Sequence, residues 1–171
     1  AGFSAAITAS NEGAKVALIG HGTIGGTCVN VGCVPSKTMI RAAEALHPSK
    51  SASRFPGLSG EASVTDWKSL IAAKDDLVTT LRQKKYIDLL PDYPGITYLA
   101  GAAQLGDGGV SVDDERIKAP KIIIATGGRP AVPAIPGIEK VQYLTSSTAL
   151  ELTEQPRSLM VIGGGYIGCE L

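Results

Sequence analysis

Two cysteines five positions apart constrain this chain of 171 residues more than any other feature. Cys28 and Cys33 stand in the run GGTCVNVGCVPSK, which covers residues 25–37. Five residues of regular helix rise about 7.5 Å, and cysteines whose Cα atoms lie more than about 7 Å apart cannot be bridged without backbone movement. A disulfide here needs a distorted backbone, which Gly32 and Pro35 permit. Because strained disulfides tend to be labile or catalytic, we interpret the pair as a redox dithiol.

Three other uses of the two cysteines stay open at this point. A structural disulfide would close only a short loop and would constrain the unfolded chain weakly. A zinc site would need about four ligands, and the chain offers three cysteines, His21 and His47. The third alternative is two unrelated buried thiols.

Composition suits a buried α/β core and argues against several partners. Sixteen basic and sixteen acidic residues give a formal net charge of zero, and no basic run is present, so nucleic acid and anionic membrane are not expected as partners. No apolar stretch approaches the length of a membrane span. The length predicts one domain, or one domain and a piece of another, and the few cysteines predict a reducing, cytoplasmic location.

The first third of the chain has the pattern of a dinucleotide-binding unit. Residues 1–14 predict a helix that Gly13 ends, and residues 15–20 predict a short buried strand. A glycine-rich turn follows over residues 22–27, where backbone N–H groups can face phosphate oxygens. The turn opens a helix that we expect to run to about His47, with a kink near Pro35.

The rest of the chain alternates short elements with glycine and proline turns. We expect a helix from an N-cap at Asp66 to about Leu90, with its charges on the face opposite the apolar side chains. Further expectations are strands at 96–100, 103–105, 110–112, 121–126 and 158–162, a turn at Asp107-Gly108-Gly109, a crossover at 130–137 and a short helix capped by residues 145–148. Residues 163–168 read GGGYIG, a G-x-G-x-x-G fingerprint that predicts a nicotinamide dinucleotide site.

The cysteine run resembles the active-site segment of the flavoprotein disulfide reductases, and residues 22–43 (GTIGGTCVNVGCVPSKTMIRAA) resemble the mercuric reductase branch most. The resemblance implies an α/β fold, with a doubly wound, Rossmann-like FAD-binding domain of the glutathione reductase type. This domain, truncated at its N-terminus, would cover residues 1–156. Residues 157–171 would begin a second Rossmann-like domain that binds NAD(P)H.

The resemblance also implies roles for individual residues. Cys33 would lie against the flavin and form a charge-transfer contact, and Cys28 would be the outer thiol that meets the substrate. Lys37 would lie by the reactive nitrogen of the flavin and pair with Glu170. Tyr166 would cover the nicotinamide pocket.

Cofactor positions follow in the same way. The residues implied for FAD are Gly2, Gly22, Thr23, Gly26, Thr27, Lys37, Ala103, Thr126 and Gly127. The residues implied for NADPH are Gly163, Gly165, Tyr166, Ile167 and Gly168. Cys169 is expected to be a small packing residue. One position departs from the family: Gly20 stands where an acidic residue usually binds the FAD ribose, so the contact is either absent or made by His21, unless His21 is a solvated loop residue.

These implications predict an FAD-dependent oxidoreductase. Electrons would pass from NADPH through FAD and a Cys28–Cys33 disulfide to Hg(II), giving Hg(0), with the two cysteines holding Hg(II) as substrate and the full-length protein a homodimer. This chain alone is expected to be inactive. The alternatives are a dihydrolipoamide dehydrogenase or glutathione-type disulfide reductase and, more remotely, a non-catalytic thiol protein that binds heavy metals.

Overall fold

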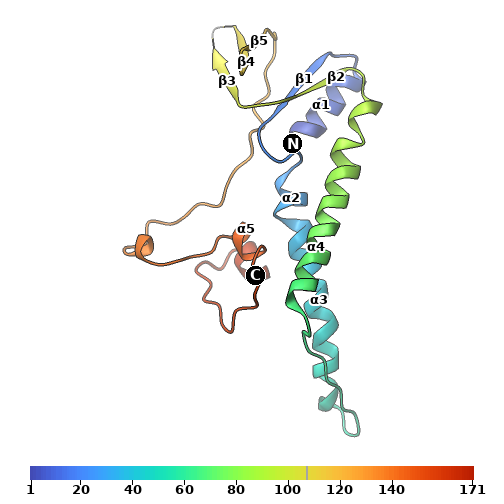
Figure 1. The fold of residues 1–171 in the computed structure, drawn as a ribbon, viewed down its shortest axis with the longest axis vertical. Helices are drawn as coiled ribbons and strands as arrows, with labels where there is room; N and C mark the ends of the chain where they lie inside the picture. Colours follow the sequence, from blue (N-terminus) through green and yellow to red (C-terminus); the bar gives the residue numbers. More distant parts are fainter. Residues whose placement is uncertain (107) are drawn as a thin grey trace. The chain divides into compact units, whose positions relative to one another are not determined.

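The computed structural model describes residues 1–106 and 108–171; Asp107, which the sequence places in a turn, lies outside the described residues. Figure 1 shows the ribbon, coloured along the sequence. The helices are α1 (Gly2–Asn11), α2 (Thr27–Asn30), α3 (Cys33–Lys50), α4 (Trp67–Arg82), α5 (Ser146–Ala149) and α6 (Tyr166–Glu170). The strands are β1 (Val16–Gly20), β2 (Ile96–Ala100), β3 (Ala103–Gly106), β4 (Gly109–Val112) and β5 (Glu115–Ile117). Short 3-10 turns lie at Ala52–Arg54, Leu90–Asp92 and Ile138–Lys140, and a π turn lies at Gln83–Ile87.

The chain forms two compact units, each built from two separate stretches. The first unit combines Ala1–Gly26 with Thr80–Gly128, and the second combines Thr27–Thr79 with Arg129–Leu171. The boundary expected after residue 156 stays a prediction.

A parallel pair of strands organises the first unit. β1 and β2 pair in register from Val16 opposite Ile96 to Gly20 opposite Ala100. Parallel neighbours need a long crossover connection, and here the chain between the two strands includes α2, α3 and α4. Helix α1 contacts both strands, and its Phe3 ring meets the Tyr86 ring edge-on at 4.8 Å between centroids.

A small antiparallel sheet completes the first unit. β3 pairs with β4, and β4 pairs with β5, so the order is β3-β4-β5. The strands expected at 96–100, 103–105 and 110–112 are confirmed within one residue. Val110 and Val112 of the central strand are buried, as expected for a strand with neighbours on both sides.

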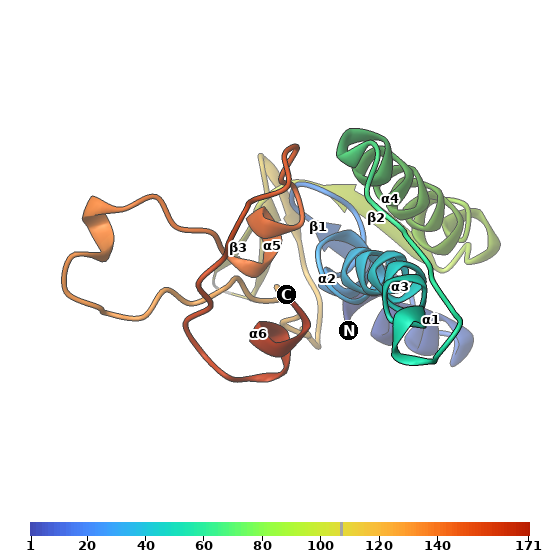
Figure 2. The same ribbon diagram turned by 90° about the horizontal axis from the view of Figure 1, so that it is seen from below.

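Helices dominate the second unit, where α3 and α4 run alongside each other (Figure 2). Asp66 caps α4 as predicted, because the Ser69 amide donates to Oδ1 at 3.1 Å and the Ser69 hydroxyl donates to Oδ2 at 2.6 Å. These bonds favour the charged carboxylate and hold the pKa of Asp66 below its ordinary value. The α-helix ends at Arg82, before the expected end near Leu90, and the π turn follows it directly.

Two side chains tie α4 to the chain after α5. Trp67 Nε1 donates to the carbonyl of Leu152 at 2.8 Å, and Lys74 Nζ donates to the carbonyl of Leu150 at 2.6 Å. The side chain of Lys74 is only 3% exposed, and its Nζ also pairs with Asp75 Oδ1 at 2.7 Å. The expectation that the charges of α4 lie away from its packed face is therefore wrong at Lys74.

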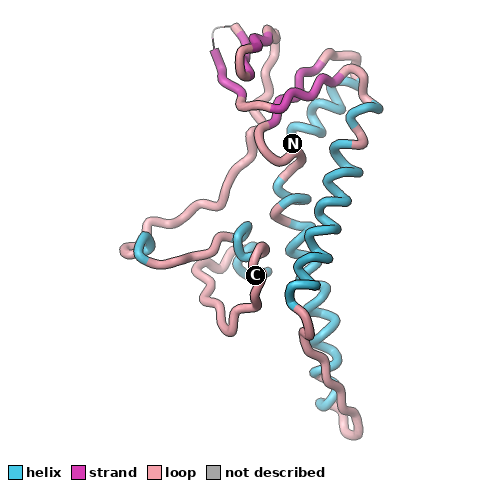
Figure 3. Tube along the Cα trace, viewed as in Figure 1, coloured by secondary structure: helices cyan, strands magenta, loops and turns pink. Residues whose placement is uncertain are grey.

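Two expected strands do not form. Residues 121–126 and 158–162 have no regular secondary structure, and Figure 3 draws both as loop. Their apolar side chains are exposed, with Ile123 at 71% and Met160 at 86%. A strand exists only through hydrogen bonds to a neighbour, and no strand in the described residues pairs with either stretch.

No helix among the described residues is both long enough and apolar enough to cross a membrane.

Candidate active site

The two cysteines lie on either side of a helix break. Cys28 belongs to α2, and Cys33 is the first residue of α3. Gly32 interrupts the helix with φ −127° and ψ −115°. A Cβ atom on Gly32 would lie 2.9 Å from the Thr27 carbonyl oxygen and 3.3 Å from the Cα atom of Cys28. Glycine is therefore required for the close approach of the two turns.

The predicted kink near Pro35 is wrong, because the distortion lies at Val31 and Gly32. Pro35 occupies the third position of α3 and is fully buried. The first turn of a helix has no internal partner for its N–H groups, so the missing N–H of proline removes no helical hydrogen bond there. Both cysteines are exposed, and Cys33 is a free cysteine, not bonded in a disulfide.

One turn further along α3, two side chains reach Glu170 of α6. Lys37 Nζ forms an ion pair with Glu170 Oε1, and Ser36 Oγ donates to Glu170 Oε2 at 3.2 Å. Hydrogen bonding to Lys37, aided by Ser36, holds the pKa of Glu170 below its ordinary value, although partial desolvation opposes the shift. The structure thus shows the contact between Lys37 and Glu170 that the resemblance implied.

Ser36 is a residue that the sequence analysis did not single out. It is buried, and its hydroxyl lies 3.4 Å from the Cys33 carbonyl as well as 3.2 Å from Glu170. A hydroxyl has a single proton to donate, and the shorter contact is to the carboxylate. No spacing rule marks Ser36, because the contact joins residues 134 positions apart.

The turn before α6 contains the glycines of the GGGYIG run. Gly163 has φ +115°, a conformation that favours glycine. Gly163, Gly164 and Gly165 have open space where a side chain would stand, whereas a Cβ atom on Gly168 would lie 2.4 Å from the Gly163 carbonyl oxygen. These features fit a phosphate group approaching the backbone and close packing of helix on turn.

The residues expected around the nicotinamide are on the surface of the second unit. Tyr166 is 80% exposed, and Ile167 is also exposed. Cys169 is exposed too, with its sulfur 3.7 Å from the Gly164 carbonyl oxygen. The expectation that Cys169 packs in the interior is wrong, because α6 has no buried residue.

Most of the residues expected to bind FAD belong to the first unit. Gly2 begins α1, and its Cβ position lies 3.5 Å from Cβ of Ala125, the neighbour of Thr126. Gly22 and Gly127 have φ +77° and +75°, with open space around both. Glycines with positive φ and free surroundings fit a loop that a phosphate group approaches closely.

The remaining expected FAD residues lie as follows. Thr23 is exposed, Gly26 is half-buried and Ala103 begins β3. Thr27 begins α2 and belongs with Lys37 to the second unit.

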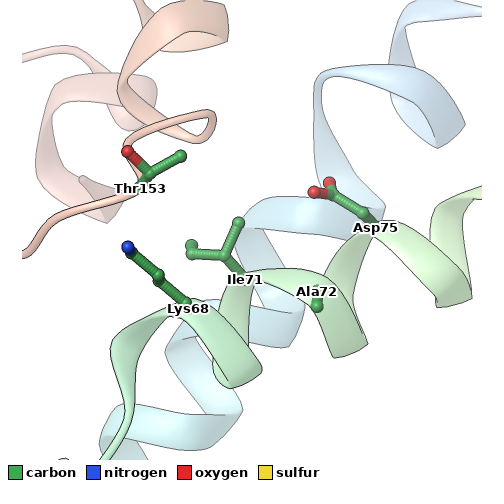
Figure 4. Close-up of a pocket in the computed structure, with 5 residues that line it drawn as sticks. All are labelled: Lys68, Ile71, Ala72, Asp75 and Thr153. Carbon is green, nitrogen blue, oxygen red and sulfur yellow. The ribbon is translucent and has the colours of Figure 1, made fainter.

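A hollow of about 420 Å³ lies beside α4, and neither Cys28 nor Cys33 lines it. Figure 4 shows Lys68, Ile71 and Asp75 of α4 on one side and Thr153 on the other. Its lining, which also includes Ala72, contains none of the residues expected at the active site. Among the described residues, no group of three or more His, Cys, Asp or Glu is arranged to hold a metal ion.

A parallel strand pair with a helix against it, two glycine turns and an exposed pair of cysteines define a dinucleotide-binding redox protein. Residues 1–171 match the family model "Pyridine nucleotide-disulphide oxidoreductase", and the chain belongs to this family. Members of the family, including mercuric reductases and flavoprotein disulfide reductases, use FAD and NAD(P)H. The predicted fold class, the glutathione reductase type of FAD-binding fold, is confirmed.

Individual relatives narrow the comparison. The chain is 50% identical over 172 residues to mercuric reductase of Lysinibacillus sphaericus and 49% identical to that of Staphylococcus aureus. Each alignment covers the whole chain and 31% of the relative. The solved structure of HOCl-induced flavoprotein disulfide reductase RclA from Escherichia coli matches 98% of the chain and 35% of its own length, with a TM-score of 0.78 and 34% identity. The chain therefore spans about a third of the length of these relatives.

Proposed function

We propose that this chain is part of an FAD-dependent reductase that passes electrons from NADPH through the Cys28–Cys33 pair to Hg(II). The observation that carries the proposal is the exposed cysteine pair on either side of the break at Gly32, one turn from the Lys37–Glu170 ion pair. The mercuric reductases that match the whole chain support Hg(II) as the acceptor.

The chemistry balances as one two-electron transfer. NADPH gives up a hydride, Hg(II) takes up two electrons to become Hg(0), and NADP⁺ and a proton are released. FAD, when bound, supplies the step between the two-electron chemistry of the nicotinamide and that of sulfur or metal.

The cysteines receive electrons and hold the substrate. A Cys28–Cys33 disulfide takes up two electrons from a first NADPH, and its S–S bond breaks to give two thiolates, of which Cys28 is accessible from solvent. The thiolates then hold Hg(II), and the two electrons that reduce it come from a further NADPH. Thiolate sulfur is a soft ligand that suits a soft cation such as Hg(II). Cys33 begins α3, where the helix dipole favours negative charge.

Lys37 and Glu170 set the charge beside the cofactor. A cation near the flavin stabilises negative charge that develops on it during reduction. The Glu170 carboxylate orients the Lys37 ammonium, and Ser36 fixes the second carboxylate oxygen. Tyr166, exposed at the start of α6, would cover the nicotinamide, and the glycines at 163–168 would admit its phosphates.

A disulfide is the second candidate acceptor, favoured by the match to a flavoprotein disulfide reductase over 98% of the chain. The electron path and residues would be the same, with glutathione disulfide or lipoamide in place of Hg(II). A cytoplasmic location, a homodimer and the preference for NADPH stay predictions from the sequence.

The test is anaerobic NADPH oxidation by the full-length protein that carries this chain. Parallel assays supply Hg(II) with excess small thiol, glutathione disulfide or lipoamide. We expect Hg(II)-dependent turnover with release of volatile mercury. Turnover with a disulfide alone would favour the second candidate, and turnover with none of the three would contradict both.

Cysteine variants test the site itself. Cys33→Ser should abolish turnover and the long-wavelength absorbance that a thiolate beside oxidised flavin produces. Cys169→Ser, which changes the third exposed cysteine, is the matched control and should retain both. A wild-type absorbance band in Cys33→Ser would overturn the role assigned to Cys33.

A further inference from the structure

At the end of β1, the Tyr98 side chain fills the space that a side chain at position 20 would need. A Cβ atom on Gly20 would lie 2.7 Å from the Tyr98 hydroxyl oxygen and 3.2 and 3.3 Å from two carbons of its ring. Real side chains do not approach so closely, so a larger residue at position 20 would force Tyr98 to move. The glycine thus leaves room that the tyrosine hydroxyl occupies.

The register of the strands places this hydroxyl on a defined face. Leu18 and Tyr98 are partners in the parallel pair, so their side chains leave the same face. Gly20, two residues after Leu18, presents that face too. Gly2, at the start of α1, approaches the same face, because its Cβ position lies 3.8 Å from Cδ1 of Leu18. The Tyr98 hydroxyl therefore lies at the carboxyl end of β1, on the side where α1 begins.

In dinucleotide-binding folds, the carboxyl end of this strand lies at the cofactor site. The pyrophosphate lies at the N-terminus of the first helix, and an acidic residue about twenty positions on binds the ribose. In this chain α1 and the end of β1 occupy those two places, and position 20 carries no carboxylate. A phenol hydroxyl both donates and accepts hydrogen bonds. Within residues 1–106 and 108–171, the Tyr98 hydroxyl makes no hydrogen bond.

We propose that Tyr98 provides the ribose contact of the FAD adenosine in place of an acidic residue at position 20. The inference rests on the proposed flavoprotein function and specifies how its cofactor is held. Neither an exposed His21 nor a loss of the contact is then needed to explain the departure at Gly20. A neutral hydroxyl replaces a charged carboxylate.

The test compares FAD with its 2′-deoxyadenosine analogue. Dissociation constants for both are measured by flavin fluorescence on the FAD-free, full-length protein. The wild type should bind FAD more tightly than the analogue. Tyr98→Phe keeps the ring and removes one hydrogen bond, so it should weaken FAD binding about threefold to tenfold and abolish the preference. Tyr143→Phe, at an exposed tyrosine, should change neither constant.

Each other outcome has a definite meaning. A Tyr98→Phe protein with wild-type preference, or a wild type without preference, would overturn the tyrosine contact and leave the flavoprotein function standing. A wild type that binds neither FAD nor the analogue would overturn the flavoprotein function and this inference together.

A second variant pair tests the competition for space. Gly20→Glu should weaken FAD binding, because its carboxylate meets Tyr98, and adding Tyr98→Ala should restore binding by making room for the acid. Thermal unfolding of the FAD-free variants checks that each is folded. Purely additive effects in this double-mutant cycle would contradict the exclusion of one side chain by the other.

Discussion

Two lysines in the second unit show that burial changes how much a lysine side chain contributes to stability. Lys37 has 56% of its side chain exposed and pairs with Glu170, whereas Lys74 has 3% exposed and donates to the Leu150 carbonyl. Each joins segments far apart in the chain. An ion pair near solvent contributes little to stability, but a buried carbonyl that loses its donor is costly. We therefore assign Lys74 to holding the unit together, and the role of Lys37 beside the cofactor stays the proposal made above.

The largest expected loss of stability comes from Lys74→Met. The variant keeps the length of the side chain and leaves the Leu150 carbonyl without its donor, which should cost about 1–3 kcal/mol of unfolding free energy. Urea unfolding followed by the fluorescence of Trp67, the one tryptophan of the chain, measures the loss. Lys68→Met, at an exposed position on the same helix, is the control and should cost no more than about 0.5 kcal/mol. Equal losses in Lys74→Met and Lys68→Met would mean that the buried hydrogen bond of Lys74 adds no stability.

A smaller loss is expected from Trp67→Phe. The ring stays apolar, but the hydrogen bond to the Leu152 carbonyl disappears, at a cost of about 1 kcal/mol. Circular dichroism replaces fluorescence as the readout in this variant. A loss greater than that of Lys74→Met would show that the tie depends more on the tryptophan than on the lysine.

The Lys37–Glu170 ion pair should make the stability of the protein depend on pH. Because the folded pKa of Glu170 is lowered, its contribution to stability is present above the ordinary glutamate value of 4.5 and is lost as the pH falls through the lowered pKa. Lys37→Met should remove most of this dependence, and Ser36→Ala should remove part of it. The Glu170 titration, followed by carboxylate NMR, measures both. An unchanged titration in Ser36→Ala would argue against a positioning role for Ser36.

The smallest effect is expected for Arg41→Ala. Arg41 and Glu44 form an ion pair at 2.5 Å on α3, with side chains 82% and 55% exposed. Such a pair should contribute no more than about 0.5 kcal/mol. Urea midpoints would reveal a greater loss, which would mean that exposed pairs in this unit cannot be ranked by solvent access.

Local chemistry made several elements predictable. Thr145 caps α5 and Thr148 returns the hydrogen bond, although the helix covers Ser146–Ala149 and so includes three of the four residues expected as its cap. Gly13, with φ +84°, follows the end of α1. Each signal lies within a few residues of the structure it determines.

Features that depend on distant partners were harder to predict. The runs at 121–126 and 158–162 have the composition of strands, but a strand needs a neighbour that composition does not supply. Lys74 was missed although a signal existed, since it lies three residues after Ile71 and four before Val78, both buried. Ser36 and Tyr98 gave no local signal, because their importance depends on Glu170 and Gly20.

The cysteines, Lys37 and the glycine turns were recognised from the sequence because their residues are close in the chain. Both Gly32 and Pro35 were expected to permit a distorted backbone, but the kink was placed near Pro35, whereas the structure has the break at Gly32. Proline is tolerated in the first turn of a helix, and the effect of Pro35 therefore depended on where α3 begins.

The buried ammonium of Lys74 also affects how the protein is made. Its acceptor, the Leu150 carbonyl, follows 76 residues later in the chain. At synthesis rates of about 5–20 residues per second, Lys74 is made roughly 4–15 s before that acceptor. Until then the Lys74 side chain stays hydrated, and α4 lacks the segment that Trp67 and Lys74 contact. Conditions that slow translation between residues 79 and 129 would lengthen the time during which the apolar face of α4 is open to other chains.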